Sequence, residues 1–248
     1  MFTATVLTKN SERTIGESLE SLSWIPEIIL LDTGSTDRTL EIARCFPNVK
    51  IHLSPFTGFG ALHNQMAVLA SHDWILSVDS DEKVSDELAS ELEELLLDPS
   101  CVYSITRWNF LFGKRVHHSG WSPDRVVRLY NRTRTSFSEV LVHEWVITEG
   151  LTALPLRHPI YHTPYLTIED FLDKMQRYSS LFAKQNRHKR VGSLPRALLH
   201  GWGAFTKAYL IKGGLLDGFN GYLIASYNAH TAFYKYLKLR ELNCKEVR

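Results

Sequence analysis

The chain has 248 residues, of which 44 % are hydrophobic and 22 % charged, and its formal net charge is +1. This composition is ordinary for a globular protein, and the length allows a sizeable core. The three cysteines are widely spaced, which argues against a disulfide framework or a cysteine metal site and favours a reducing cytoplasm. We expect neither a transmembrane helix nor a signal peptide, because no apolar stretch has the required length or flanking residues.

The first hundred residues alternate strand signals with helix signals. Short runs of apolar and β-branched residues predict buried strands at residues 3–7, 28–31, 49–53 and 74–78. After each of them, apolar residues at helical spacing predict a helix with a buried face, formed by Ile15, Leu19, Leu22, Leu40, Ala43, Leu62, Met66, Leu69, Leu88, Leu92 and Leu95. This alternation predicts an α/β fold with a doubly wound, mostly parallel sheet.

The pattern changes after Pro99. Further strands are predicted at residues 102–108 and 126–130, with another at 137–142, so the sheet is expected to become mixed. From Ile168 onward the periodicity is helical, at residues 168–187, 194–212 and 219–239. We therefore expect a helical extension to follow the sheet.

The small net charge hides an asymmetry that changes sign near Gly150. Residues 1–150 carry 13 basic and 21 acidic side chains, whereas residues 151–248 carry 15 basic and 6 acidic ones. Either the basic half faces an anionic partner, or the two halves neutralise each other across an interface. The aromatic and basic residues of the last helices fit contact with an anionic membrane surface, or packing on the catalytic domain or a partner subunit. An acidic first half without a recognition motif argues against nucleic-acid binding.

Two carboxylates follow the fourth predicted strand. Asp79 and Asp81 come directly after the apolar run that begins at Trp74, and Glu82 is beside them. Open α/β sheets bind ligands at the carboxyl ends of their strands, and carboxylates gathered there are costly unless they meet a cation. Oxygen ligands suit Mg²⁺ or Mn²⁺, which are typically shared with substrate phosphates, although a charged loop after a strand would look the same.

Polar residues also follow the first two strands. Thr8 and Asn10 end the first strand, and Asp32 ends the second, where Gly34 permits close approach of a ligand and Ser35 begins a helical turn. A capped loop would look similar. However, parallel strand order should bring these ends and Asp79 to one crevice, which is more specific than any single motif.

The motifs of the first half follow one another at a characteristic spacing: Thr8 with Asn10, residues 32–37, residues 58–60 with Asn64, and residues 74–82. Together they resemble the inverting family 2 glycosyltransferases, which have the GT-A fold. Later segments are similar to a subgroup that includes lipopolysaccharide-core glucosyltransferases: residues 113–114, 119–124, 128–130, 142–144 and 217–218. The chain departs from the family at Arg38, in place of a glycine, and at His63, where Arg or Lys is common.

The resemblance implies a GT-A catalytic domain over residues 1–150, with a nucleotide-sugar half at 1–100 and an acceptor half at 101–150, and a mainly helical extension over 151–248. It implies a donor site for a UDP-sugar formed by Thr8, Asn10, Asp32, Gly34, Ser35, Asn64 and Asp79. Within it, Asp32 would contact uracil, Asp79 would face the ribose or the metal, and Asp81 would coordinate a divalent metal, Mg²⁺ or Mn²⁺.

The acceptor side requires a base on the opposite face of the sugar, and a carboxylate serves this role well. Glu144 stands where the resemblance implies the general base, and Asp124 is the alternative. The acceptor, a glycolipid or a saccharide, would be bound by Trp121, Arg125 and Arg128, because arginine can hold an anion through two hydrogen bonds. The histidines His117, His118 and His143 are further candidates for metal or phosphate contacts.

The leading hypothesis is therefore a metal-dependent inverting transferase. It would move a hexose such as glucose from a UDP-sugar to a bacterial surface glycan such as the lipopolysaccharide core, on the cytoplasmic face of the membrane. A nucleotidyltransferase is an alternative, but it would need a glycine- and lysine-rich loop after the first strand, which residues 8–11 do not provide. A catalytically silent sugar-binding or scaffold protein is the other alternative. The sequence leaves the oligomeric state open.

Overall fold

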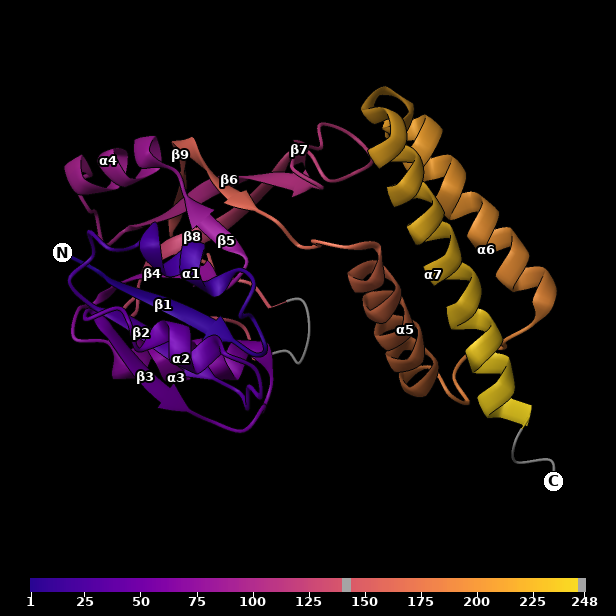
Figure 1. Cartoon of the computed structure of the whole chain (residues 1–248), viewed down its shortest axis with the longest axis horizontal. Helices are drawn as coiled ribbons and strands as arrows, with labels where there is room; N and C mark the ends of the chain where they lie inside the picture. Colours follow the sequence, from indigo (N-terminus) through magenta and orange to yellow (C-terminus); the bar gives the residue numbers. More distant parts are fainter. Residues whose placement is uncertain (140–143, 245–248) are drawn as a thin grey trace. The chain divides into compact units, whose positions relative to one another are not determined.

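The computed structural model describes residues 1–139 and 144–244 (Figure 1). The described chain forms two compact units. The first comprises residues 1–108 and 124–162, and the second residues 109–123 together with the chain from Thr163 onward. Each unit has its own apolar clusters, as expected for separate domains.

The first unit is built on a mixed sheet. Its parallel half has the order β3 (Val49–Leu53), β2 (Ile28–Asp32), β1 (Thr3–Thr8) and β4 (Trp74–Asp79). Beyond β4 the sheet continues with antiparallel β8 (Asp124–Asn131), then β6 (Cys101–Leu111), β9 (Thr152–His162) and β5 (Glu82–Val84). The predicted α/β fold with a doubly wound, mixed sheet is confirmed.

Helices cover both faces of the parallel half because its strands alternate their apolar side chains between the two faces. Ala4, Val6 and Leu30 pack with α1 (Ile15–Glu20), α2 (Thr39–Ala43) and α4 (Asp86–Glu94). Ile29 and Leu31 pack on the other face with α3 (Phe59–Leu69). In the register of the sheet, Thr8 pairs with Asp32 and Leu7 with Asp79, so the three strand ends lie side by side.

The second half of the sheet differs from the prediction. Strands β5 and β9 were not predicted, because β5 is only three residues long and β9 contains Pro155 and Pro159, which are unusual within strands. The strand predicted at residues 137–142 is described only as an isolated bridge between Phe137 and Val146, and residues 140–142 lie outside the described residues.

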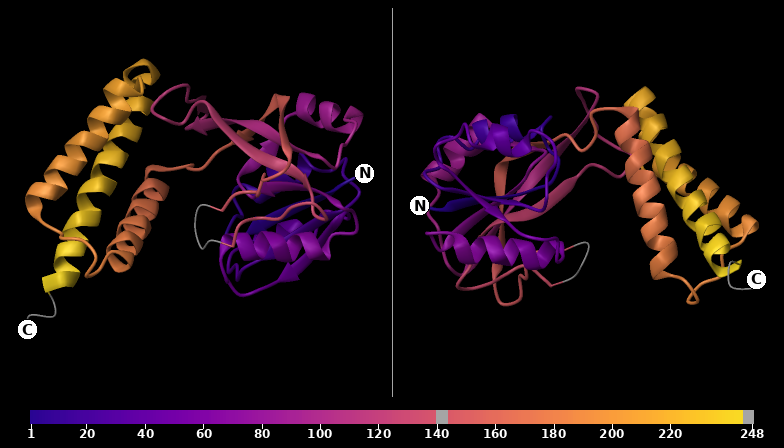
Figure 2. Two further views of the ribbon diagram at one scale, coloured as in Figure 1. Left: turned by 180° about the vertical axis from the view of Figure 1, so that it is seen from behind. Right: turned by 60° about the horizontal axis from the view of Figure 1, so that its bottom comes forward.

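The second unit is helical. It contains α5 (Ile168–Gln185), α6 (Leu194–Thr206), a π-helical turn η1 (Lys207–Ile211), a 3₁₀ turn η2 (Gly214–Asp217) and α7 (Gly218–Cys244), and the short strand β7 (Lys114–Arg115) pairs with the end of β6. Figure 2 shows α6 and α7 lying side by side. The segment predicted as one helix at 194–212 is α-helical as far as Thr206 and then continues as the π-helical turn η1. Among the described residues, no helix is apolar over a length that would cross a bilayer.

A buried carboxylate, Glu27, connects the amino-terminal ends of three parallel strands. It accepts hydrogen bonds from Thr3 Oγ1 at 2.6 Å, Lys50 Nζ at 2.6 Å, Ser71 Oγ at 2.6 Å and the Ser71 backbone N–H at 2.7 Å. Burial alone would raise the pKa of Glu27, but these four donors outweigh it and lower the pKa to about 2. The ionised side chain thus stabilises the folded chain at neutral pH.

We predict that Glu27→Gln lowers the free energy of unfolding at pH 7 by up to about 3 kcal/mol. Because the pKa of Glu27 falls from 4.5 to about 2 on folding, its contribution is present above about pH 4.5 and is lost as the pH drops toward 2. Urea unfolding between pH 7 and pH 2 would measure this, with exposed Glu20→Gln as the matched control. Equal pH dependence of the wild type and Glu27→Gln would contradict the prediction.

Candidate functional site

The loop after β2 is organised by Asp32, which is buried at the end of that strand. Its carboxylate accepts the backbone N–H groups of Gly34 and Ser35, each at 2.9 Å, and also the Ser35 hydroxyl. Gly34 has a φ of +99°, a conformation that other residues rarely adopt. The predicted residues Asp32, Gly34 and Ser35 therefore form one rigid turn.

Asn10 joins this turn from the end of β1. Its backbone N–H donates to Ser35 Oγ at 2.8 Å, and its Oδ1 accepts the Thr36 N–H at 2.8 Å. Thr8 is buried and pairs with Asp32 in the sheet, while its hydroxyl has no hydrogen-bond partner within the described chain. The predicted meeting of the first two strand ends is thus present in the structure.

An open pocket of about 400 Å³ lies beside the turn. It is lined by Asp32, Thr33, Gly34 and Ser35 of the turn and by Leu40 and residues 53–55. Polar groups together with apolar side chains are typical of a small-molecule site. The size suits a flat ring that contacts the apolar side chains.

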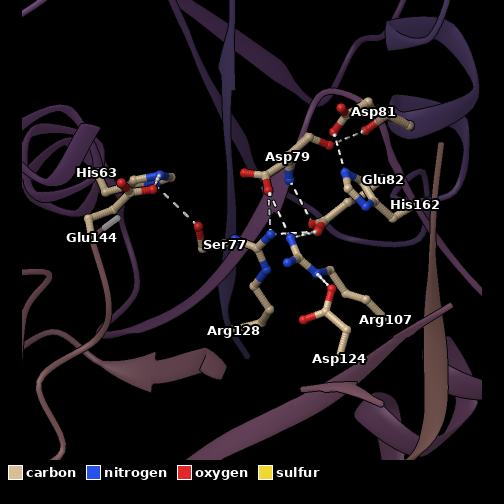
Figure 3. A network of polar contacts seen from close by, with 11 residues as sticks. His63, Ser77, Asp79, Asp81, Glu82, Arg107, Asp124, Arg128, Glu144 and His162 are labelled. Carbon is tan, nitrogen blue, oxygen red and sulfur yellow. Dashed lines mark hydrogen bonds and ion pairs between the residues drawn. The ribbon is translucent and has the colours of Figure 1, made fainter. Parts of the chain in front are cut away.

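The end of β4 is dominated by a buried cation (Figure 3). The guanidinium of Arg128, from β8, contacts the carboxylate of Asp79 and lies 2.5 Å from Glu82 Oε1. The other oxygen of Glu82 accepts the Asp79 backbone N–H at 3.0 Å. Arg128 and Glu82 are almost completely buried, whereas the Asp79 side chain remains 34 % exposed. Asp79 is therefore the member of this group that a ligand can reach.

The charges in this cluster shift each other's pKa values. Burial raises the pKa of Glu82. For Asp79, burial is outweighed by the charge of Arg128, which holds the pKa of Asp79 below its ordinary value. Burial likewise fails to neutralise Arg128, because the two carboxylates raise its pKa above the ordinary value. Asp79 and Arg128 therefore remain charged at neutral pH.

A second arginine, Arg107 from β6, extends the cluster. It donates from Nε to Asp124 Oδ2 at 2.9 Å and lies 3.4 Å from Glu82 and 3.9 Å from Asp79. Asp124, the alternative base, is thus held in an ion pair at the start of β8. Arg128, predicted to bind the acceptor, is buried between carboxylates, and its role in acceptor binding stays a prediction.

Asp81 lies in the turn between β4 and β5. Its Oδ1 is 3.6 Å from Nε2 of His162, the last residue of β9, and the two side chains are 33 % and 15 % exposed. A carboxylate oxygen of this turn and an imidazole nitrogen at the end of β9 thus face each other (Figure 3). Among the described residues, no group of three His, Cys, Asp or Glu side chains is close enough to hold a metal by itself.

Glu144 belongs to a separate cluster on α3 and β4. Its Oε1 lies 4.0 Å from Nε2 of His63, whose Nδ1 is 3.3 Å from Ser77 Oγ and whose ring stacks on Phe137 at 4.3 Å between centroids. Burial lowers the pKa of His63 to about 4. His63 is therefore neutral at pH 7, and its contact with Glu144 is not an ion pair.

The other predicted residues lie in different surroundings. Both amide atoms of Asn64 bond to the Phe137 backbone, at 2.8 and 3.0 Å, so a role in donor binding stays a prediction. Arg125 is exposed and contacts backbone carbonyls at 3.5 Å. Trp121 belongs to the second unit, where it stacks on Tyr165 and Phe171.

The predicted histidines are not gathered at one site. The backbone N–H groups of His117 and His118 donate to the buried carboxylate of Asp217 within the second unit, at 3.0 and 2.8 Å. His143 lies outside the described residues.

Three residues of the site were not assigned a role from the sequence: Arg107, Glu82 and His162. A signal was present for Arg107, because it is the one charged residue of the strand predicted at residues 102–108, and a charge in a buried strand requires a partner. Glu82 and His162 could not be found in this way because their strands were not predicted.

Comparisons with known proteins agree with this geometry. The family model described as glycosyl transferase family 2 matches residues 3–147. An uncharacterized glycosyltransferase of Rickettsia typhi is 28 % identical over 255 residues, covering 97 % of this chain and 87 % of its own length. The lipopolysaccharide core biosynthesis glycosyltransferase LpsC of Rhizobium meliloti is 24 % identical, covering 99 % of this chain and 94 % of its own.

Among solved structures, the mannosyltransferase PcManGT of Pyrobaculum calidifontis, in complex with GDP-Man and Mn²⁺, is similar in fold. It aligns with a TM-score of 0.51 and 15 % identity, covering 100 % of this chain and 88 % of its own. The family match spans the parallel half of the sheet, the Asp79–Asp81 strand end and Glu144. The chain belongs to glycosyl transferase family 2 and has the GT-A fold of these enzymes.

Proposed function

We propose that this glycosyltransferase transfers a hexose from a UDP-sugar, with inversion and with the help of a divalent metal, to a saccharide of a bacterial surface glycolipid. The observation that carries the proposal is the convergence of the Asp32 turn, Asp79 and Asp81 at adjacent strand ends, with the carboxylate of Glu144 in a separate cluster. The names of LpsC and of the mannosyltransferase complex support a glycan acceptor and a nucleotide-sugar donor. Glucose is the hexose that the sequence resemblance favours.

The nucleotide fits the pocket beside the Asp32 turn. A uracil ring would contact the apolar side chains of Leu40 and Leu53, while Asp32 and the backbone of the turn would supply polar contacts. Asp79, exposed and ionised next to Arg128, would accept hydrogen bonds from the ribose hydroxyls.

Asp81 and His162 are the residues that would hold the metal. One carboxylate oxygen and one imidazole nitrogen form a donor set that suits Mn²⁺, an ion that proteins typically share with substrate phosphates. We assign Asp79 to the ribose side because Arg128 already engages its carboxylate. When bound, the ion would stabilise the negative charge that develops on the leaving diphosphate.

Glu144 is the better candidate for the general base. His63, which lies 4.0 Å from Glu144, is kept neutral by burial, whereas Asp124 pairs with the permanent charge of Arg107. Glu144 would accept the proton of the acceptor hydroxyl as that oxygen bonds to the anomeric carbon. The bond from this carbon to the diphosphate breaks on the opposite face, which inverts the configuration.

We predict that Asp81→Asn lowers metal-dependent transfer by at least about 100-fold, and that His162→Ala raises the Mn²⁺ concentration needed for half-maximal activity by about 10- to 100-fold. Release of UDP at increasing Mn²⁺ would measure both effects. Asp73→Asn, at an exposed ion pair with Arg132, is the matched control and should behave as wild type. Normal turnover by folded Asp81→Asn would contradict the metal assignment.

We predict that Glu144→Gln lowers kcat by about 10²- to 10⁴-fold while a UDP-sugar still raises the melting temperature, because the base is lost and the donor site is kept. Asp124→Asn should mainly weaken the ion pair with Arg107 and so lower the free energy of unfolding by about 1–3 kcal/mol. If Asp124→Asn stays folded and loses transfer while Glu144→Gln remains active, the base is Asp124.

A further inference from the structure

The second unit exposes large apolar side chains around the turn between α6 and α7. Trp202, Leu210, Ile211, Leu215, Leu216 and Phe219 are each between 57 % and 74 % exposed, and we call these six residues the apolar tip. Single exposed apolar residues are normal on protein surfaces. Six of them within 18 positions of the chain are a concentration typical of an interaction surface.

Buried contacts within the second unit fix the conformation of the apolar tip. The buried carboxylate of Asp217 accepts the backbone N–H groups of His117 and His118, which fixes the 3₁₀ turn to the 117–119 segment of the same unit. Gly221 packs so closely on this turn that a Cβ atom would lie 1.7 Å from the Gly214 carbonyl oxygen. The apolar side chains of the turn are therefore presented outward by a packed structure.

The charge of the helices in the second unit is strongly one-sided between Lys174 and Arg240. Residues 174–240 contain 12 Lys and Arg and a single acidic residue, Asp217, whose side chain is 5 % exposed. Lys207 and Lys212 are exposed on either side of Leu210 and Ile211. A second copy of this unit would carry the same positive charge, so self-association through this face is electrostatically opposed.

Apolar side chains flanked by lysines fit the interface of an anionic bilayer, where acyl chains meet negatively charged headgroups. Trp202 adds an aromatic side chain of the kind that lies at headgroup level. Since no described helix is apolar over a membrane-spanning length, such contact would be with the surface of the bilayer.

We propose that the apolar tip inserts into the headgroup region of an anionic phospholipid membrane, with Lys207 and Lys212 contacting lipid phosphates. This binding goes beyond the proposed transfer reaction, since it requires neither the donor nor the acceptor sugar. It makes the tip a membrane anchor built from a rigid helical turn.

Sedimentation of the full chain with phospholipid vesicles tests the proposal. We expect the wild type to bind vesicles of phosphatidylcholine mixed with phosphatidylglycerol, and to bind pure phosphatidylcholine much more weakly. Leu215→Ser with Leu216→Ser should weaken binding by about tenfold or more through lost apolar insertion, and Lys207→Gln with Lys212→Gln by a similar factor on the anionic vesicles alone.

The matched control is Val68→Ser with Leu96→Ser, because these two side chains are 80 % and 91 % exposed on the first unit and should not affect binding. Unchanged melting temperatures would show that the variants are folded. The proposal is overturned if the wild type does not bind anionic vesicles, or if both tip variants bind as well as the wild type. It is equally overturned if the wild type forms a dimer that the Leu215 and Leu216 substitutions dissociate, because the tip would then be a protein interface.

Discussion

The site depends on one buried cation, Arg128. Without it, Asp79 and Glu82 would face each other at the end of β4 and depend on the more distant Arg107 for compensation, and a buried charge that loses its close partner costs several kcal/mol. With it, Asp79 stays ionised and fixed while its exposed edge remains open to a ligand. The same residue lies on β8, the first antiparallel strand, and so ties the parallel half of the sheet to the antiparallel half. Arg128 therefore both compensates the two carboxylates and connects the two halves of the sheet.

The parallel half of the fold could be predicted almost completely from the sequence. Buried parallel strands are short apolar runs, and the runs at residues 3–7, 28–31, 49–53 and 74–78 correspond to β1 to β4 within one residue at each end. The antiparallel half is harder to predict from the sequence, because β9 is partly exposed and contains two prolines, and β5 is too short to show any periodicity. Local sequence carries little information about a strand whose stability comes from distant partners.

Some contacts of the candidate site could be predicted from the sequence and others could not. The turn formed by Asn10, Asp32 and Ser35 is local to adjacent strand ends, so the sequence indicated it correctly. The contacts of Arg128 and the pairing of Asp81 with His162 join residues far apart in the chain. The spacing of residues in the sequence does not predict such contacts. The metal, the base and the donor sugar remain proposals, whereas membership of glycosyl transferase family 2 follows from the match over residues 3–147.

The core of the helical unit includes a segment from the middle of the chain, residues 109–123. Leu111 and Val116 pack with Tyr165, Phe171 and Ile224, and Asn220 donates to the Leu111 carbonyl at 2.9 Å. The helices therefore cannot be exchanged between relatives by recombining the carboxyl-terminal part alone, since the transplanted helices would lack the 109–123 segment that completes their core. Diversification of this unit during evolution would have to proceed by coordinated substitution in both segments, which couples changes near residue 115 to changes near residue 220.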